Sequence, residues 1–254
     1  MHLDDVVRRL RGAGCVFAED EAALLLAQTS DLARLTGLVD RRASGDPLEQ
    51  VLGWAAFCGL RITLAPGVFV PRRRTELLVR EAAALLRPGD VVVDLCCGSG
   101  AVASAIEAAV PGVVAHAADL DAVAVACARG NVAGAVHQGD LFDALPPELA
   151  GRVCVVVANA PYVPTDAIAT MPPEARLHEP RVALDGGADG VDLQRRIARD
   201  APRWLGSGGR LLMETSRGQV PLTAAACVAA GFDVSVAEDD ELDAVVVRAE
   251  LSRG

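Results

Sequence analysis

An alternation of strand-like and helix-like segments from Pro71 to the end of the chain constrains the fold more than any other sequence feature. Short apolar segments rich in valine, at 91–95 and 153–158, have the length and composition of buried strands. Segments with helical periodicity lie between them, at 101–109 and 122–131. Strands that alternate with helices predict a doubly wound, mostly parallel α/β sheet.

The rest of this region continues the alternation. We expect helices at 75–86, 191–205 and 220–230 and strands at 113–118, 135–137, 210–214, 232–237 and 244–248. The last two strands are so close in sequence that one of them is expected to run antiparallel at the sheet edge.

The first 46 residues have a different pattern, which predicts a small helical domain. Apolar residues recur there at helical spacing: Val6, Val7 and Leu10; Ala23, Leu24 and Ala27; Leu32, Leu35 and Leu38. Ser44-Gly45-Asp46-Pro47 ends this pattern, and residues 54–70 predict short strands turning at Gly59 and at Pro66-Gly67. We therefore expect a helical domain over 1–46, a hairpin linker over 47–70 and an α/β domain over 71–254.

Composition excludes several classes of protein. The formal net charge of −10 argues against a bulk basic surface for duplex nucleic acid. Seven cysteines, an odd number with no Cys-x-x-Cys pair, favour a reduced intracellular protein with buried thiols over a disulfide or zinc framework. Acidic residues follow Met1, and no apolar run reaches the ~18 residues of a membrane span, so we expect a cytoplasmic protein without a membrane partner.

Acidic residues follow three strands in succession: Asp94, Asp119 and Asp140. Gly98-Ser99-Gly100 lies just after the first, where glycines let a ligand approach the backbone. Gly98-x-Gly100-x-x-Ala103 formally matches a dinucleotide fingerprint, but Asp94 would repel a pyrophosphate. The same carboxylate would pair with the ammonium group of S-adenosylmethionine, which carries no phosphate. Asp119 is placed to accept from ribose hydroxyls and Asp140 from an adenine amino group. An ordinary turn with an exposed Asp94 is the alternative.

The tetrapeptide Asn159-Ala160-Pro161-Tyr162 ends the strand at 153–158, at the sheet edge where ligands bind in α/β folds. The side-chain oxygen of Asn159 and the carbonyl of Ala160 can accept both hydrogens of one planar NH2 group, and Tyr162 can cover its face. We therefore interpret these four residues as a clamp for an amide or amino group. The alternatives are that Asn159 caps a loop and that Tyr162 belongs to the core.

These motifs resemble class I S-adenosylmethionine-dependent methyltransferases, and more narrowly the glutamine-N5 methyltransferases of peptide chain release factors. The narrower resemblance covers about residues 47–250 and is carried by 47–53, 70–72, 75–79 and 179–190. It implies a Rossmann-like methyltransferase sheet, S-adenosylmethionine as donor with S-adenosylhomocysteine as product, and a release factor as protein substrate. We also expect a monomer, and the acidic composition argues against a stable nucleic-acid partner.

The resemblance also implies the functional residues. The clamp residues Asn159, Ala160, Pro161 and Tyr162 would be catalytic. The cofactor would be bound by Asp94, Cys96, Cys97, Gly98, Ser99, Gly100, Asp119, Leu120, Asp140, Leu141 and Asn159, with no metal.

This chain departs from the family at three places. Cys96-Cys97 stands where the family usually has Gly-Thr, so a Cβ narrows the space near the methionine moiety. Ala160 replaces the first proline of Asn-Pro-Pro-Tyr, which we expect to reduce rigidity while the carbonyl stays in place, since Pro161 still favours an extended backbone before it. The N-terminal helical region is also shorter.

Other polar residues have simpler explanations. His116 and His137 are expected to be structural, and Arg72-Arg73-Arg74 to be a solvated cluster or to steer an acidic protein partner. Two other functions remain open: an adenine-N6 methyltransferase acting on nucleic acid, which would use the same clamp, and a non-catalytic cofactor-binding or interaction module.

Overall fold

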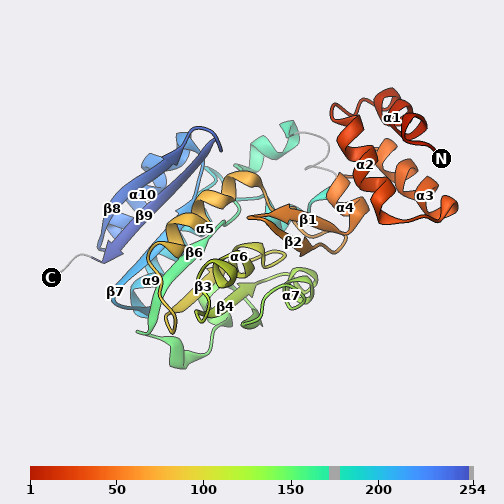
Figure 1. The fold of residues 1–254 in the computed structure, drawn as a ribbon. Helices are drawn as coiled ribbons and strands as arrows, with labels where there is room; N and C mark the ends of the chain where they lie inside the picture. The colour runs from red at the N-terminus through yellow and green to blue at the C-terminus, as the bar shows by residue number, and fades with distance from the viewer. Residues whose placement is uncertain (172–177, 252–254) are drawn as a thin grey trace.

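The computed structural model describes residues 1–171 and 178–251 and confirms the doubly wound α/β fold (Figure 1). Within these residues, seven strands form the main sheet in the order β5-β4-β3-β6-β7-β9-β8. The strands are β3 Val91–Leu95, β4 Val114–Asp119, β5 Ala135–Gln138, β6 Val153–Ala158, β7 Leu205–Glu214, β8 Phe232–Asp239 and β9 Ala244–Leu251. The carboxyl ends of β3, β4, β5 and β6, which pair in parallel, therefore meet at one edge.

The sequence predicted an antiparallel strand at the sheet edge, but the antiparallel strand, β9, lies one place inside the edge. β9 pairs antiparallel with both β7 and β8, and β8 forms the edge. The burial of the two strands explains the order, because β9 begins with four buried residues whereas β8 mixes buried with exposed ones. A strand that is apolar on both faces takes an internal place in the sheet.

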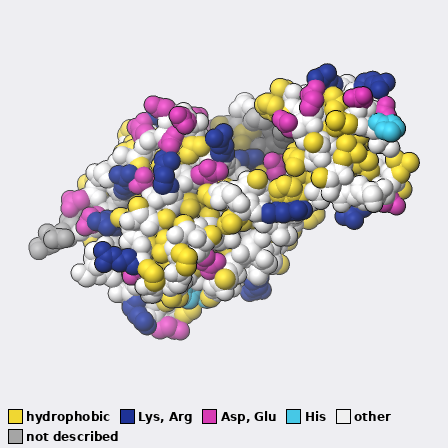
Figure 2. All heavy atoms as spheres, in the orientation of Figure 1, with side chains coloured by type: hydrophobic (Ala, Val, Ile, Leu, Met, Phe, Trp, Pro, Cys, Tyr) yellow, Lys and Arg dark blue, Asp and Glu magenta, His cyan; other side chains and the backbone are white. Residues whose placement is uncertain are grey.

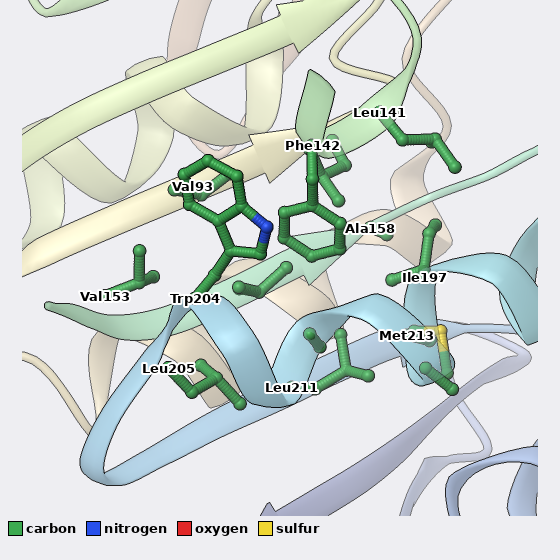
Figure 3. Close-up of a cluster of buried hydrophobic side chains, with 14 of the residues drawn as sticks. Val93, Leu141, Phe142, Val153, Ala158, Ile197, Trp204, Leu205, Leu211 and Met213 are labelled. Atoms are coloured by element: carbon green, nitrogen blue, oxygen red, sulfur yellow. The ribbon is translucent and has the colours of Figure 1, made fainter. Parts of the chain in front are cut away.

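Helices cover both faces of the sheet. The first face carries α5 Glu76–Ala83, α6 Ala101–Ala109 and α7 Ala122–Ala128, and the other carries α9 Asp192–Trp204 and α10 Val220–Ala229. Alternate residues of each strand therefore enter different apolar clusters: Val92 packs toward α5 and α6, and Val93 toward α9. Figure 3 shows the second cluster, where the rings of Phe142 and Trp204 stack with centroids 5.6 Å apart.

The N-terminal region is a helical group with its own apolar cluster. It comprises α1 Leu3–Gly12, α2 Ala18–Gln28, α3 Leu32–Ala43 and α4 Leu48–Leu52. It lies at the opposite end of the molecule from β8 and β9 (Figure 1). The antiparallel pair β1 Trp54–Phe57 and β2 Leu60–Thr63 follows, as the expected hairpin, and turns at Cys58-Gly59 with both residues at positive φ.

The buried face of α2 differs from the face that the spacing of apolar residues predicted. Ala23, Leu24 and Ala27 are exposed, whereas Glu21, Ala22 and Leu25 are buried. Nearly every position from 22 to 27 is apolar, so periodicity alone could not choose a face. Glu21 turns inward because it forms an ion pair with Arg42 of α3, with 2.7 Å between Glu21 Oε2 and Arg42 Nε.

Several boundaries also differ from the sequence prediction. The helix at 122 ends at Ala128, three residues early. β7 begins at Leu205 rather than at Arg210, because Leu205 already pairs with Val153 of β6 across an irregular stretch in which Gly208 lies at φ 73°. No helix among the described residues is long and apolar enough to cross a bilayer. On the face that Figure 2 shows, arginines and acidic residues are interspersed and form no single basic patch.

Candidate active site

One pocket at the carboxyl edge of the sheet brings the predicted site residues together. Its lining includes Asp94, Cys96, Cys97, Gly98, Ser99, Asp119, Leu120, Asp140, Leu141, Asn159, Ala160, Pro161 and Tyr162. Gly100 alone among the predicted residues does not line it. Instead Gly100 turns the chain into α6 at φ 76°, where an added Cβ would lie 2.5 Å from Val132 Cγ2.

Asp94, at the end of β3, is a buried acid without a cation. Its Oδ2 accepts a hydrogen bond from the backbone N–H of Ala103, in the first turn of α6, at 3.1 Å. Burial raises the pKa of Asp94 to about 7, against the lowering effect of that hydrogen bond. No ion pair involves Asp94 in the part of the chain that the structure describes, so its charge is not compensated from within the protein.

Asp119, at the end of β4, joins the glycine loop to the next helix. Its Oδ2 accepts from the Gly98 N–H at 2.8 Å and its Oδ1 from the Asp121 N–H at 2.9 Å. Burial raises the pKa of this carboxyl, and the two backbone donors oppose the rise. The backbone therefore holds the carboxylate in one orientation at the pocket wall, with oxygen lone pairs left over for a ligand.

Asp140, the third acid, has a partner that the sequence did not suggest. Arg196 of α9 donates to Asp140 Oδ2 at 2.7 Å. The predicted contact to an adenine amino group would therefore share this carboxylate with an arginine. Leu141 follows at φ 51°, a left-handed backbone that presents its side chain to the pocket.

The glycine loop is strained at one cysteine. Cys96 lies at φ 58°, in the left-handed region where a Cβ is unfavourable, and the loop continues through Gly98 at φ 55°. Burial and neighbouring acids raise the pKa of Cys96 and of Cys97, so neither thiol is poised as a nucleophile.

The clamp is held by side chains from distant parts of the chain. Asn159 Nδ2 donates to Thr75 Oγ1 at 3.2 Å. Tyr162 donates its hydroxyl to Glu214 Oε1 at 3.4 Å, and Gln219 Nε2 donates to the Tyr162 carbonyl at 2.7 Å. Burial and the Glu214 charge raise the pKa of Tyr162 to about 12. Ala160 borders the pocket but is only 1 % exposed, because it belongs to the buried apolar cluster.

The 179–190 segment packs against the clamp. Val163 N–H donates to the Leu184 carbonyl at 3.0 Å, and Gly186 N–H donates to the Val163 carbonyl at 2.8 Å. A Cβ added at Gly190 would lie 2.3 Å from the Tyr162 carbonyl oxygen and 2.2 Å from Gln219 Nε2. These glycines are therefore required by close backbone packing.

Two of the three clustered arginines have specific partners, which corrects the expectation of a solvated cluster. Arg72 forms an ion pair with the buried Glu179 and lies over the Phe69 ring at 5.0 Å. Arg74 Nε is 3.5 Å from Glu214 Oε1, and its guanidinium is 5.9 Å from the Tyr162 ring centroid. Arg73 is exposed.

The two histidines contact each other away from the clamp. His116 Nδ1 and His137 Nε2 are 3.0 Å apart, and their rings stack. Burial lowers the pKa of both. Within residues 1–171 and 178–251 no group of three or more metal-ligating side chains is suitably placed for a metal ion.

Sequence reasoning missed the supporting residues Thr75, Arg196, Glu214 and Gln219. Thr75 lies within a motif that carried the resemblance, but its spacing gives no sign of a contact with Asn159, 84 residues later. The one available signal for Glu214 was its position at the end of an apolar strand, which is the position that made the three aspartates candidates.

The chain is similar in sequence to known methyltransferases. The sequence family described as "Methyltransferase small domain" matches residues 59–225. A release factor glutamine methyltransferase from Geobacter sulfurreducens is 37% identical over 223 residues, covering 85% of this chain and 78% of that protein. A protein of the same name from Streptomyces coelicolor is 43% identical over 199 residues, covering 74% and 70%.

Two further matches are to methyltransferases with other names. A 4-amino-L-phenylalanine/4-methylamino-L-phenylalanine methyltransferase from Streptomyces pristinaespiralis is 37% identical over 238 residues, covering 84% of this chain and 81% of that protein. Among solved structures, a methyltransferase from Pyrococcus furiosus superposes with a TM-score of 0.57 at 15% identity, covering 76% and 88%. At that identity the likeness bears on the fold alone.

Proposed function

Because the chain belongs to the release factor glutamine methyltransferase family, we propose that it transfers a methyl group to the side-chain nitrogen (N5) of a glutamine in a peptide chain release factor. The observation that carries this proposal is that Asn159 faces the same pocket as the glycine loop and the strand-end acids. A methyl acceptor held by the clamp would therefore meet a donor held by the loop.

The pocket suits S-adenosylmethionine as the donor. Asp94 is a buried carboxylate with no cation of its own in the described chain, which fits an ammonium group, and acids at three strand ends disfavour a phosphate-bearing ligand. Asp119 would hold the ribose, and the backbone of 96–99 with Leu120 and Leu141 would line the remaining surface. When bound, this cofactor supplies a methyl group on a sulfonium and leaves as S-adenosylhomocysteine.

The clamp residues would orient the acceptor. A glutamine amide is a weak nucleophile because its nitrogen lone pair is delocalised into the carbonyl. Asn159 Oδ1 and the Ala160 carbonyl would each accept one N–H of the amide, which directs the lone pair and favours the pyramidal nitrogen that forms with the new bond. These hydrogen bonds strengthen toward the transition state, as catalysis requires. Tyr162 would cover one face of the amide.

We also propose that residues 1–46 recognise the protein substrate, that 47–70 link, and that 71–254 carry the chemistry. The apolar cluster of α1 to α3 is separate from those of the sheet, which supports a distinct N-terminal unit, and α4 at the start of the linker packs against it. Phe17 is 68 % exposed at the start of α2 and Val16 is 83 % exposed beside it, which gives this region an apolar surface for a protein partner.

A second candidate acceptor is the amino group of a small aromatic molecule. The relative named for 4-amino-L-phenylalanine is as similar to this chain as one of the release factor enzymes, and the clamp grips any planar NH2 group. Arg72 and Arg74, at the pocket wall, would suit the carboxylate of such an acceptor.

The test is to incubate the protein with methyl-labelled S-adenosylmethionine and, separately, a release factor, 4-amino-L-phenylalanine and adenine-containing DNA. We expect label on the release factor, at the glutamine nitrogen by mass spectrometry, and none on DNA. Label on 4-amino-L-phenylalanine alone would replace the proposed acceptor with the second candidate. Label on DNA alone, or on no acceptor, would overturn the proposal.

A further inference from the structure

The side-chain amide of Asn159 can face the acceptor in two ways, and only one is useful. Its oxygen accepts hydrogen bonds and its nitrogen only donates, so a flipped side chain would present N–H groups to an acceptor NH2. In the structure Nδ2 points to Thr75 Oγ1, at 3.2 Å, which leaves Oδ1 for the pocket. The question is what keeps the amide in this orientation.

Thr75 by itself does not decide it. A threonine hydroxyl both donates and accepts, so it could equally donate to Asn159 Oδ1. Thr75 is 2 % exposed, and in the described structure its oxygen accepts the hydrogen bond from Asn159. Its own hydrogen therefore needs another acceptor nearby.

Glu214 is that acceptor. The residue is 1 % exposed at the end of β7, and its Oε2 is buried without a hydrogen bond of standard geometry within residues 1–171 and 178–251. Thr75 interacts with this carboxyl closely enough to counter the rise in pKa that burial causes. Tyr162 and Arg74 approach Oε1, and Oε2 has no hydrogen-bond partner among the described residues. An unpaired buried oxygen of this kind is costly, which favours rotation of the Thr75 hydroxyl toward it.

We propose that Thr75 and Glu214 are positioning residues that fix the Asn159 amide with its oxygen toward the methyl acceptor. An ionised Glu214 can only accept hydrogen bonds, so the Thr75 hydroxyl donates its hydrogen to Glu214. The Thr75 oxygen can then only accept from Asn159, which places Asn159 Nδ2 toward Thr75 and Oδ1 toward the pocket. Arg74, beside Oε1, favours the ionised carboxyl. The inference rests on the proposed role of Asn159 as the acceptor clamp.

The first test measures methyl transfer by three single variants. In Glu214→Gln the new amide can donate to Thr75, which reverses the chain of donors and flips Asn159, so we expect kcat to fall about 100-fold. Thr75→Val removes the hydroxyl that fixes the Asn159 amide but does not favour the flipped amide, so we expect kcat to fall about tenfold. Thr75→Ser keeps the hydroxyl and should stay within about threefold of wild type. The affinity for the methyl donor, measured by calorimetry, should change less than about twofold in all of them.

The double variant Thr75→Val/Glu214→Gln separates positioning from a general loss of structure. Without the Thr75 hydroxyl, the Glu214 substitution has no route to Asn159, so the double variant should match Thr75→Val and exceed Glu214→Gln in activity. Independent structural damage would instead multiply the two losses to about 1000-fold. That result, or wild-type kcat in Glu214→Gln, would overturn the proposal.

A second readout needs no activity. The chain contains only two asparagines, Asn131 and Asn159, so labelling asparagine with nitrogen-15 gives two side-chain NH2 signals. We expect Thr75→Val and Glu214→Gln to shift the Asn159 signals and to leave those of Asn131, bonded to the Ser99 and Thr63 carbonyls, unchanged. If the wild type methylates no acceptor, the proposed function fails, yet these spectra still test the orientation of the Asn159 amide. Unchanged Asn159 signals in both variants would refute its positioning by Thr75 and Glu214.

Discussion

The two sides of the pocket are held in place by different means. On the cofactor side, Asp94 and Asp119 are oriented by backbone N–H groups of Ala103, Gly98 and Asp121, which lie 2 to 21 residues from the carboxyl that each one contacts. On the acceptor side, the clamp at 159–162 is oriented by side chains that lie 52 to 84 residues away in the sequence. Apart from Asp140, which Arg196 of α9 holds, the cofactor side is a local backbone structure, whereas the acceptor side is a long-range side-chain network.

This difference separates binding from chemistry. A carboxylate held by backbone donors keeps its place when other side chains change, whereas the clamp depends on every member of its network. Substitutions on the acceptor side should therefore lower the rate and spare cofactor affinity. Substitutions on the cofactor side should show in stability and in binding.

The largest effect is expected at Asn159. Asn159→Ala removes the oxygen that would grip the acceptor, and we expect kcat to fall at least 10³-fold, or about 4 kcal/mol in activation free energy. The dissociation constant for S-adenosylmethionine, from calorimetry, should change by less than about fivefold, since Asp94 and Asp119 are untouched. A variant with nearly full activity would remove Asn159 from the chemistry, and a parallel loss of cofactor binding would erase the distinction between the two sides.

Asp94 should produce the next largest effect, as a pH dependence of stability in the cofactor-free protein. Its pKa rises from 3.8 in the unfolded chain to about 7 in the fold, so the folded state keeps a proton that the unfolded state has lost. Stability contributed by this group is present at low pH and is lost as pH rises toward 7, by at most about 4 kcal/mol. Asp94→Asn should abolish this loss.

The measurement is the free energy of unfolding in urea, for both proteins, from pH 4 to pH 8. We expect the difference between Asp94→Asn and wild type to grow in favour of the variant across this range and to level off above pH 7. Taking the difference cancels the other carboxyls. A difference that stays constant with pH would mean that Asp94 is ionised in the fold and paired with a group of the protein.

The same contrast explains what could be predicted from sequence. The strands, the three strand-end acids and the glycine loop were predicted because each depends on a short local pattern: valine-rich runs, a terminal acid, closely spaced glycines. The place of β9 inside the sheet was not predicted, because strand order depends on which of two late strands is buried on both faces.

The residues that hold the clamp could not be predicted from local sequence patterns. Nothing around Thr75 or Glu214 indicates that they meet beside Asn159, since three separate strands and helices bring them together. Arg196 reached Asp140 in the same way, from α9. The exposed Ala23, Leu24 and Ala27 show the opposite limit, where apolar residues on every side of a helix leave local periodicity without a preferred face.

Gly190 tests how tightly the 179–190 segment supports the clamp. Gly190→Ala would place a Cβ 2.3 Å from the Tyr162 carbonyl oxygen at φ 81°, and we expect about 3 kcal/mol of destabilisation in urea unfolding. Gly151→Ala is the matched control, since Gly151 lies at φ 73° with no atom within 4 Å of the added Cβ. It should cost only about 1 kcal/mol, from backbone strain alone. Equal losses at the two glycines would mean that the packing against Tyr162 is loose.

The smallest effect is expected on the cofactor side, at Cys96. Its φ of 58° favours glycine, so Cys96→Gly should be more stable than Cys96→Ala by about 1 kcal/mol, the reverse of the usual order. Cys97 is the control, because its φ is not positive, and there alanine should be the more stable substitution. Urea unfolding of the four variants measures both differences. If alanine is better at both positions, the loop does not hold Cys96 in a left-handed conformation, and the backbone of the cofactor side is less fixed than its hydrogen bonds to Asp119 indicate.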